Sequence, residues 1–409
     1  MIAVAITLYQ PHHRVMDMHS INFPHRTWLN AEECRIEDLE ALLDDSTSKK
    51  DVPLATTIEK NVPGYDVATV ESAYSNSNAL RELGDEWART LRSGAGIFII
   101  KGAFSRQVID ASNEVLEALL AEQRENKVNN GDHFAPPGTN ERLWGAQEKF
   151  AFRSAETYVD YYNNPTLALA CAAWLGPMYQ VTSDLNVVLP GGKAQTAHRD
   201  YHLGFMEQRQ AERFPSHVHA LSACLTLQGA IAHCDMPLES GPTQYLPFSQ
   251  RYLEGYLAIQ REDVRQLFQD RYIQLPLDKG DAVFFNPALF HCAGSNTSSD
   301  IRRMANLIQV SSGFGRAMGN LDRMAICRAI YPTLAERASR HGSESVAHAI
   351  AASAEGYPFP TNLSKDQPIN SLVPETQAEL ITHALDKRLS TEDFITKLQE
   401  QFNRRQPGD

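Results

Sequence analysis

The sequence predicts an α+β fold: a double-stranded β-helix core of the jelly-roll or cupin type, flanked by N- and C-terminal helices. Two observations support this prediction. The middle of the chain, residues 179–310, alternates short β-prone runs with turns rich in Pro, Gly, Asn and Asp. The segments on either side repeat apolar residues at helical spacing. Many short strands with long connections are typical of antiparallel double-sheet barrels.

The bulk composition is that of a globular protein. The chain has 409 residues, of which 43% are hydrophobic, and a formal net charge of -12. This acidic balance argues against a surface for nucleic-acid phosphates or a polybasic membrane patch. No apolar run approaches the roughly 20 residues of a membrane-spanning helix. We therefore expect neither nucleic acid nor membrane as a partner.

The chain start and the cysteines predict a cytoplasmic location. Residues 1–9 are apolar, but no basic segment precedes them and no small-residue cleavage site follows them, so we do not expect a signal peptide. The six cysteines are scattered and form no Cys-x-x-Cys pair. Such a pattern fits free thiols in a reducing compartment.

Three parts are expected along the chain. Residues 1–78 form an N-terminal arm, residues 79–311 the β-helix domain, and residues 312–409 a helical extension. We expect the two terminal extensions to offer contacts for a homo-oligomer. Residues 126–149, polar and rich in Gly and Pro, are expected to form a long loop over a site.

The spacing of apolar residues and turn residues gives the expected elements in order. Ser105 is the expected N-cap of the helix that follows it. Helices are expected over 31–43, 80–91, 106–125, 165–175, 251–269, 321–330, 334–352, 375–389 and 391–405. Strands are expected over 97–100, 179–181, 186–189, 219–226, 243–246, 271–275, 282–285 and 305–310.

The motif His198-Arg199-Asp200 supplies the first two candidate metal ligands. On extended chain, residues two apart point to the same side, so an imidazole and a carboxylate can bind one ion. A second His-x-Asp motif begins at His233. It leaves too little chain before His291 for the strands that should separate the ligands, and we interpret it as part of a turn.

His291 is the expected third ligand, because it follows the predicted strand 282–285. Two histidines and one carboxylate that leave positions open are typical of non-haem Fe(II) oxygenases. Arg302 lies eleven residues beyond His291, and its planar guanidinium suits the far carboxylate of 2-oxoglutarate. Arg303 is the adjacent alternative, and strand alternation would turn it outward if Arg302 faces the site.

The run from His291 to Arg302 resembles the distal motif of the phytanoyl-CoA dioxygenase family. That motif has Asn five, Ser seven and Arg eleven residues after the His, here Asn296, Ser298 and Arg302. The similarity covers roughly residues 79–311. Its further matches are Leu83-Gly84 to Ala103-Phe104, Trp174-Leu175-Gly176-Pro177, the central turn at residues 233–242 and Gly280-Asp281-Ala282-Val283-Phe284-Phe285. At other places the chain differs from the usual family residue, as at Ala230, Gln250 and Ala293.

The resemblance implies a full set of roles. His198, Asp200 and His291 would be the catalytic iron ligands, and Arg302 and Asn186 would bind 2-oxoglutarate. The implied cofactors are Fe(II), 2-oxoglutarate as co-substrate, and O2. The implied reaction oxidises a C–H bond of a small-molecule metabolite, with succinate and CO2 as co-products. Because Asp200 occupies the carboxylate position, hydroxylation or another hydrogen-abstracting oxidation is expected, and not halogenation.

Two other classes of function stay open from the sequence. One is a cupin-type metal-dependent hydrolase or isomerase, although no Glu adjoins either ligand motif. The other is a non-catalytic binding protein with the same barrel. Further candidate pocket residues are Gln195, Tyr201, His202, Thr226 and Gln228. The last set of candidates would either line the substrate entrance or pack beneath a loop: Trp144, Tyr158, Tyr161 and Tyr162.

Overall fold

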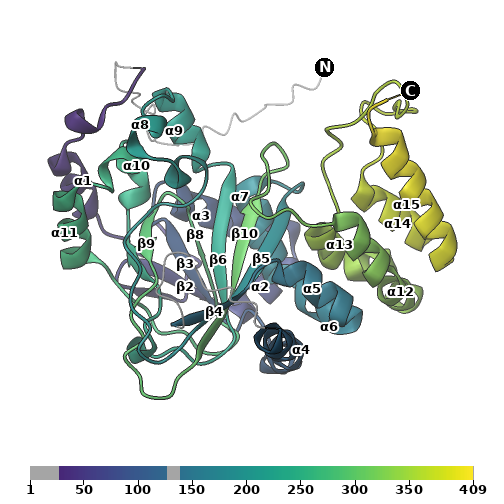
Figure 1. The fold of residues 1–409 in the computed structure, drawn as a ribbon, viewed down its shortest axis with the longest axis horizontal. Helices are drawn as coiled ribbons and strands as arrows, with labels where there is room; N and C mark the ends of the chain where they lie inside the picture. Colours follow the sequence, from purple (N-terminus) through teal and green to yellow (C-terminus); the bar gives the residue numbers. More distant parts are fainter. Residues whose placement is uncertain (1–26, 127–138, 409) are drawn as a thin grey trace, which may run out of the picture.

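The computed structural model describes residues 27–126 and 139–408, which form a mixed α/β fold around a large mixed sheet (Figure 1). The sheet has eight strands in the order β1-β2-β3-β8-β6-β10-β5-β4. Their bounds are β1 Thr57–Glu59, β2 Val62–Asp66, β3 Ile97–Lys101, β4 Asn140–Leu143, β5 Gln180–Val188, β6 Thr226–Ala232, β8 Ala282–Phe285 and β10 Arg303–Ser311.

Strand pairing in the large sheet is antiparallel except between β2 and β3, which run parallel. The longest ladder joins β10 to β5 over nine residues, from Arg303 opposite Val188 to Ser311 opposite Gln180. On its other side β10 pairs with β6. β10 is therefore flanked on both sides, so the direction of its side chains is set along its whole length.

A second, smaller layer consists of four short extended segments. β7 (Gln244–Leu246) pairs with β9 (Phe290–Cys292), and Tyr245 lies opposite His291. An antiparallel bridge joins His198 to His291 on one side, and another joins Tyr245 to Ile273 on the other. The first bridge brings together two of the expected metal ligands from distant parts of the chain.

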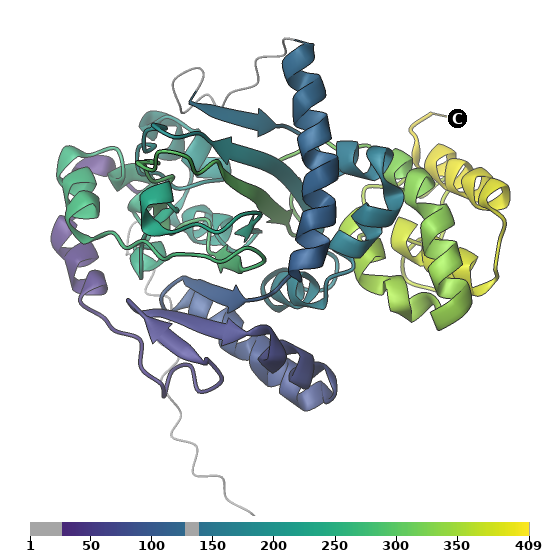
Figure 2. The ribbon, with the colours of Figure 1, turned by 90° about the horizontal axis from the view of Figure 1, so that it is seen from below.

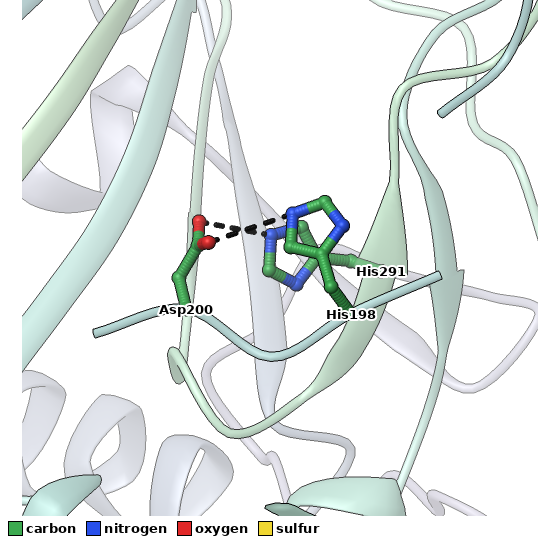
Figure 3. A group of neighbouring side chains, drawn as sticks. All are labelled: His198, Asp200 and His291. Carbon is green, nitrogen blue, oxygen red and sulfur yellow. Dashed lines mark ion pairs between the residues drawn. The ribbon is translucent and has the colours of Figure 1, made fainter. Parts of the chain in front are cut away.

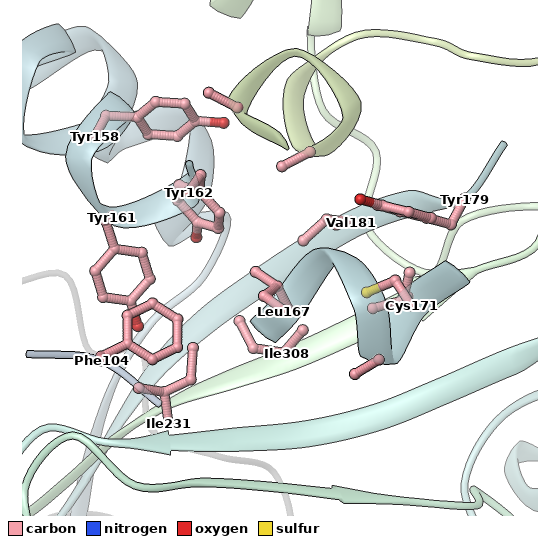
Figure 4. Close-up of a cluster of buried hydrophobic side chains, with 14 of the residues drawn as sticks. Phe104, Tyr158, Tyr161, Tyr162, Leu167, Cys171, Tyr179, Val181, Ile231 and Ile308 are labelled. Carbon is pink, nitrogen blue, oxygen red and sulfur yellow. The ribbon is translucent and has the colours of Figure 1, made fainter. Parts of the chain in front are cut away.

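The outward face of the large sheet carries the main hydrophobic core. Val181 of β5, Ile231 of β6 and Ile308 of β10 point from this face toward α7 (Pro165–Leu175), as Figure 4 shows. Pro at the first position and an Asn164 cap start this helix. Because strand side chains alternate, the residues between these apolar ones face the opposite side of the sheet.

The remaining helices cover the sheet and form one end of the molecule. Figure 1 shows α3 and α7 behind the sheet, and in Figures 1 and 2 α12–α15 gather at the C-terminal end. The predicted cap at Ser105 is confirmed, since its side chain accepts a hydrogen bond from Val108 N. The other helices are α1 Ile36–Leu43, α2 Val67–Tyr74, α3 Ser77–Arg92, α4 Arg106–Glu125, α5 Ala146–Arg153, α6 Ala155–Tyr162, α8 Gln208–Ala211, α9 Ser216–Ser222, α10 Gly255–Ala258, α11 Glu262–Arg271, α12 Arg323–His341, α13 Ala347–Ser353, α14 Gln377–Asp386 and α15 Thr391–Arg405.

Two predicted strands are wrong. At residues 271–275, Arg271 ends α11 and only Ile273 forms an isolated bridge. The other is the strand predicted over residues 219–226. Most of residues 219–226 lies in the helix α9 and the turn after it, and β6 starts only at Thr226. Ser216, His219 and Ser222 are the buried residues of α9, a spacing of three that suits a helix. The buried imidazole of His219 bonds to the Ala211 carbonyl through Nε2 at 3.0 Å. This local packing outweighs the β-prone composition of the segment.

Other differences concern where elements begin and end. β5 is one nine-residue strand where two short strands were expected. α12 continues through Pro332, where a break between two helices was expected. The first two strands belong to the large sheet although they lie in the expected N-terminal arm. In the expected loop 126–149, residues 127–138 lie outside the described residues, and β4 and α5 occupy most of the remainder.

Candidate metal centre and its cavity

One cavity of about 530 Å³ lies between the two layers. The inward side chains of the large sheet line one side, and residues of the small layer line the other. From the large sheet come Ile99, Thr182, Asp184, Asn186, Gln228, Ala230, Ala232, Val283, Phe285, Arg303, Ala305, Leu307 and Gln309. From the other wall come Gln195, His198, Asp200, Tyr245, His291 and Ala293.

The structure brings His198, Asp200 and His291 together at this cavity (Figure 3). One potential ligand atom from each residue lies within 4.8 Å of the other two. His198 Nε2 is 3.5 Å from Asp200 Oδ1, and His291 Nε2 is 3.4 Å from Asp200 Oδ2. The ring centroids of the two histidines are 4.6 Å apart. Two imidazole nitrogens and one carboxylate therefore converge on a common point.

The protonation of both imidazoles follows from their backbone contacts. His198 Nδ1 lies 2.8 Å from the Thr196 carbonyl, and His291 Nδ1 lies 2.8 Å from the Leu289 carbonyl. A carbonyl only accepts, so Nδ1 carries the proton and Nε2 keeps its lone pair. Both free lone pairs are on the nitrogens that face Asp200. This donor set fits a divalent transition metal such as iron.

Asp200 is held as a carboxylate. Gln228 Nε2 donates a hydrogen bond to Asp200 Oδ2 at 2.5 Å. Burial tends to raise the pKa of Asp200. When the imidazoles are protonated, the hydrogen bond with His291, the charges of both imidazoles and the bond from Gln228 outweigh burial and hold the pKa of Asp200 well below its usual range. An ionised carboxylate is the form that a metal ion binds.

The chain turns sharply after Asp200. Tyr201 has φ +64° and His202 φ +43°, so the extended conformation ends at the second ligand. His202 consequently leaves the face of the metal ligands, and its Nδ1 lies 3.0 Å from the Ser222 hydroxyl. Tyr201 is buried outside the cavity lining. Backbone strain of this kind costs about 1–3 kcal/mol per residue and is common at functional sites.

The expected position of Arg302 is wrong. Its guanidinium forms ion pairs with Glu117 at 2.7 Å and Glu141 at 3.1 Å on the surface, and 41% of its side chain is exposed. Arg303 faces the cavity instead and is 6% exposed. β10 starts at Arg303, and its inward residues are the odd-numbered ones. Alternation therefore turns Arg302 outward, contrary to the expectation from the motif spacing.

Arg303 lacks an acidic partner. Its Nη1 lies 3.3 Å from the carbonyls of Ser240 and Gly294. Among the described residues, no carboxylate forms an ion pair with this guanidinium. Burial lowers the pKa of Arg303 to about 10. A buried cation without a carboxylate is costly, and a bound acid would offset that cost.

Asn186, the other predicted 2-oxoglutarate contact, also lies at the cavity. It is on β5 opposite Ala305 of β10, and it lines the cavity. Its Oδ1 is buried and has no hydrogen-bond partner among the described residues. Between the metal ligands and Arg303 the sheet presents the small side chains of Ala230, Ala232 and Ala305. These small side chains therefore leave free space in the cavity over this part of the sheet.

The other sequence candidates fall into two groups. Gln195, Gln228 and Trp144 line the cavity. The three tyrosines and Thr226 do not; the tyrosines belong to the core behind the sheet (Figure 4). There the Tyr161 hydroxyl lies 2.9 Å from His233 Nε2.

The two side chains of the second His-x-Asp motif have separate environments, one in the core and one on the surface. The imidazole of His233 is buried between Tyr161 and Asn113, whose Oδ1 lies 2.6 Å from Nδ1. Asp235 is exposed and pairs with Arg106 at 3.1 Å. The two side chains thus do not share a site. The interpretation of this motif as part of a turn is confirmed.

Sequence reasoning missed a charged pair at the outer part of the cavity. Arg142 Nη2 lies 3.5 Å from Asp184 Oδ2, and the Arg142 guanidinium stacks over Trp144 at 3.9 Å. Asp184 also accepts a bond from Gly145 N at 2.7 Å. Period-two alternation from Asn186 would have indicated Asp184, had the strand been extended by two residues.

The chain matches a known protein family. No match was found among curated protein sequences. The family profile described as phytanoyl-CoA dioxygenase (PhyH) matches residues 93–304, which is more than half of the chain.

None of the described helices combines the length and apolar character needed to cross a bilayer.

Several solved structures resemble the chain at low identity. The non-heme alpha ketoglutarate dependent epimerase SnoN from nogalamycin biosynthesis is 17% identical, covering 58% of this chain and 84% of its own, with a TM-score of 0.39. The corresponding carbocyclase SnoK is 22% identical, with coverages of 56% and 83% and a TM-score of 0.40. AviO1 from Streptomyces viridochromogenes Tue57 is 16% identical, with coverages of 57% and 95% and a TM-score of 0.39.

The profile match includes both ligand segments, and its last matched residue is Met304. The sequence left open a cupin-type metal-dependent hydrolase or isomerase and a non-catalytic binding protein, whereas the family match supports an enzyme that depends on iron and 2-oxoglutarate. The chain belongs to the phytanoyl-CoA dioxygenase (PhyH) family and is an oxidoreductase that depends on iron and 2-oxoglutarate.

Proposed function

We propose that this protein hydroxylates a C–H bond of a free small-molecule metabolite and converts 2-oxoglutarate to succinate and CO2. The observation that carries the proposal is one cavity with a His-Asp-His cluster and a buried arginine that lacks an acidic partner among the described residues. The volume of about 530 Å³ lies within the range of small-molecule sites. It supports a compact substrate together with the co-substrate.

His198, Asp200 and His291 are the proposed iron ligands. Iron held there supplies the oxygen-activating chemistry that cleavage of an unactivated C–H bond requires. The protein's own contribution is orientation. Each Nδ1–H is fixed by a backbone carbonyl, and Gln228 fixes the Asp200 carboxylate. Such outer contacts keep the ligand atoms directed at the metal.

Arg303 is the proposed anchor of 2-oxoglutarate, in place of Arg302. Its guanidinium can donate two parallel hydrogen bonds to the far carboxylate of the co-substrate. The alanines between Arg303 and the metal cluster give the co-substrate room over the sheet. Asn186 borders the same stretch, and its amide oxygen has no hydrogen-bond partner within the described part of the chain. We retain it as a proposed 2-oxoglutarate contact.

The two layers of strands support a finer description of the fold. We propose that they are the two halves of a double-stranded β-helix. The small layer, with His198, β9, β7 and Ile273 side by side, would be the second sheet. We also propose a cytoplasmic location, which the six free cysteines favour. A homo-oligomer formed through the terminal extensions stays a prediction.

Release of succinate tests the proposal. Purified protein supplied anaerobically with Fe(II), and then with 2-oxoglutarate and O2, should form succinate only when all three are present. His198→Ala or Asp200→Ala should lower this rate by about 100-fold or more, since outer contacts alone are worth 10–100-fold.

A matched control is His383→Ala. This exposed histidine pairs with Glu375 far from the cavity, and its variant should retain the wild-type rate. Turnover of Asp200→Ala at the wild-type rate would exclude the assigned metal site.

A further inference from the structure

Arg199 lies between the two ligands of the His-x-Asp motif and points away from them. Only 2% of the residue is exposed, and it is absent from the cavity lining. On an extended segment, the side chain between two residues of one face lies on the other face. The guanidinium is therefore available to hold the segment in place from behind.

Backbone carbonyls of another segment bind this guanidinium. Arg199 Nη2 donates to the carbonyl of Ser249 at 2.6 Å and to that of Tyr252 at 2.8 Å. These residues belong to the short 3-10 turn after β7 and to its end. Hydrogen bonds from an ionised donor are roughly twice as strong as neutral ones.

The same contacts reach the third ligand. The Arg199 guanidinium lies 4.7 Å from the ring centre of Phe290, the residue before His291. Ser249 joins the two ligand segments, because its carbonyl accepts from Arg199 and its hydroxyl accepts from Phe290 N at 2.8 Å. On its other side the guanidinium lies 4.9 Å from the ring centre of Tyr256.

Among the described residues no carboxylate forms an ion pair with Arg199. Burial lowers the pKa of Arg199 to about 10, although the charge of Glu254 tends to raise it. Two carbonyls and two aromatic rings are what offset the loss of hydration. The residues around the guanidinium thus fit one planar cation closely and leave little space for any larger group. A Cβ added at Gly255 would lie 2.0 Å from the Arg199 Cζ.

We propose that Arg199 is a positioning residue that holds both parts of the metal site, the His198–Asp200 pair and His291, in one geometry. It touches neither metal nor substrate and acts through Ser249 and Phe290. This inference rests on the proposed iron site. It adds that the affinity for iron depends on a cation on the opposite side of the ligand segment.

Arg323 offers a matched control for loss of a buried guanidinium. It is also buried, and it donates to the carbonyl of Val181 at 2.7 Å and to that of Ser353 at 3.3 Å. It lies on α12 and does not line the cavity. Arg199→Met and Arg323→Met each remove one buried cation that binds backbone carbonyls. A purely structural role would therefore give the two variants the same behaviour.

The test is the dissociation constant for Fe(II), measured by anaerobic equilibrium dialysis of the full chain with metal analysis. We expect Arg199→Met to weaken Fe(II) binding by about 10–100-fold, as for other contacts that orient ligands. Arg323→Met should change it less than about threefold, although both variants lose stability to urea. Gly255→Ala, which keeps Arg199 but displaces its guanidinium, should weaken Fe(II) binding as well.

Other results of the Fe(II)-binding measurement would contradict either the inference or the iron site itself. Equal Fe(II) affinity of Arg199→Met and the wild type would overturn the inference, as would equal weakening in Arg323→Met. If Arg199→Met does not fold, the soluble Gly255→Ala variant decides by the same criterion. If His198→Ala binds Fe(II) as tightly as the wild type, the proposed iron site itself fails, which is a separate result.

Discussion

Arg302 and Arg303 are adjacent residues of the same type in opposite environments. Arg302 is on the surface between Glu117 and Glu141, whereas Arg303 is buried in the cavity. The motif spacing pointed to the first, and the register of β10 points to the second. Spacing alone could not decide, because the residue at which the strand begins sets which side chains face inward.

Substitution of each arginine separates the two roles. Arg303→Met should raise the KM for 2-oxoglutarate about 100-fold or more, because it removes two hydrogen bonds between charged groups, each worth about 1.5–3 kcal/mol. Arg302→Met removes only surface ion pairs and should leave KM within about twofold. Succinate formation at varied 2-oxoglutarate concentration measures both. The opposite ranking would restore Arg302 as the anchor.

The candidate metal ligands were more accessible to sequence reasoning. His198 and Asp200 are two residues apart, and period-two alternation is enough to place them on one side. Their partner His291 was identifiable because it follows a short apolar strand. Arg199 and Gln228 were not identifiable as supports of the site. Their contacts join segments that are distant in the sequence, and no local pattern records such pairs.

At the scale of elements, β10 organises the cavity. Its outward residues enter the core with α7, and its inward residues line the space above the sheet. Ala305 is the inward residue opposite Asn186 on one side and Ala232 on the other. A larger side chain there would occupy the proposed place of 2-oxoglutarate.

Ala305→Leu should therefore raise the KM for 2-oxoglutarate about tenfold, because overfilling a packed site costs about 1–3 kcal/mol. Met304→Leu changes the neighbouring residue on the opposite face with little change in volume, and should leave KM unchanged. The same kinetic assay tests both variants, with urea unfolding to confirm that they are folded. An unaltered KM in Ala305→Leu would place the co-substrate elsewhere.

Elements with a strong periodic pattern were predictable, and those defined by tertiary contacts were not. The helix after Ser105 has both a cap and an apolar stripe, and it forms as expected. Residues 219–226 were expected to form a strand, but His219 is held in a helix by its bond to Ala211. β1 and β2 are short, and they are joined through Lys60 and Asn61, both at positive φ. Only pairing with β3 makes them part of the sheet.

At the scale of the whole molecule, the expected C-terminal extension shares the main core. Phe394 of α15 stacks on Tyr331 of α12 with ring centres 3.9 Å apart. Both residues belong to the cluster that includes Ile308 of the sheet. The strand β2 joins the expected N-terminal arm to the same sheet. The division of the chain into three parts stays a prediction. The shared core does not require these parts to be separate units.

Buried histidines make the stability of the whole chain depend on pH. Burial lowers the pKa of His233 to about 3, against an ordinary value of 6.5. Between these values the unfolded chain binds a proton that the folded chain does not, so stability falls as the pH falls below about 6.5. For this residue alone the loss at pH 5 is about 2 kcal/mol.

Urea unfolding at pH 7 and pH 5 measures the effect. Between pH 7 and pH 5 the free energy of unfolding of the wild type should fall by about 2 kcal/mol more than that of His233→Gln, because the variant lacks the titrating imidazole. An identical dependence in His233→Gln would show that His233 does not contribute.

The bridge between His198 and His291 has a consequence for folding. The two residues are 93 positions apart in the chain (291 − 198), yet they lie side by side in the small layer. Bringing such distant segments together costs chain entropy that grows slowly with the length of the closed loop. A metal ion bound to both imidazoles would act as a removable crosslink, since it binds the folded chain in preference to the unfolded one. Iron supply would then govern how much of this protein persists folded as well as how fast it works.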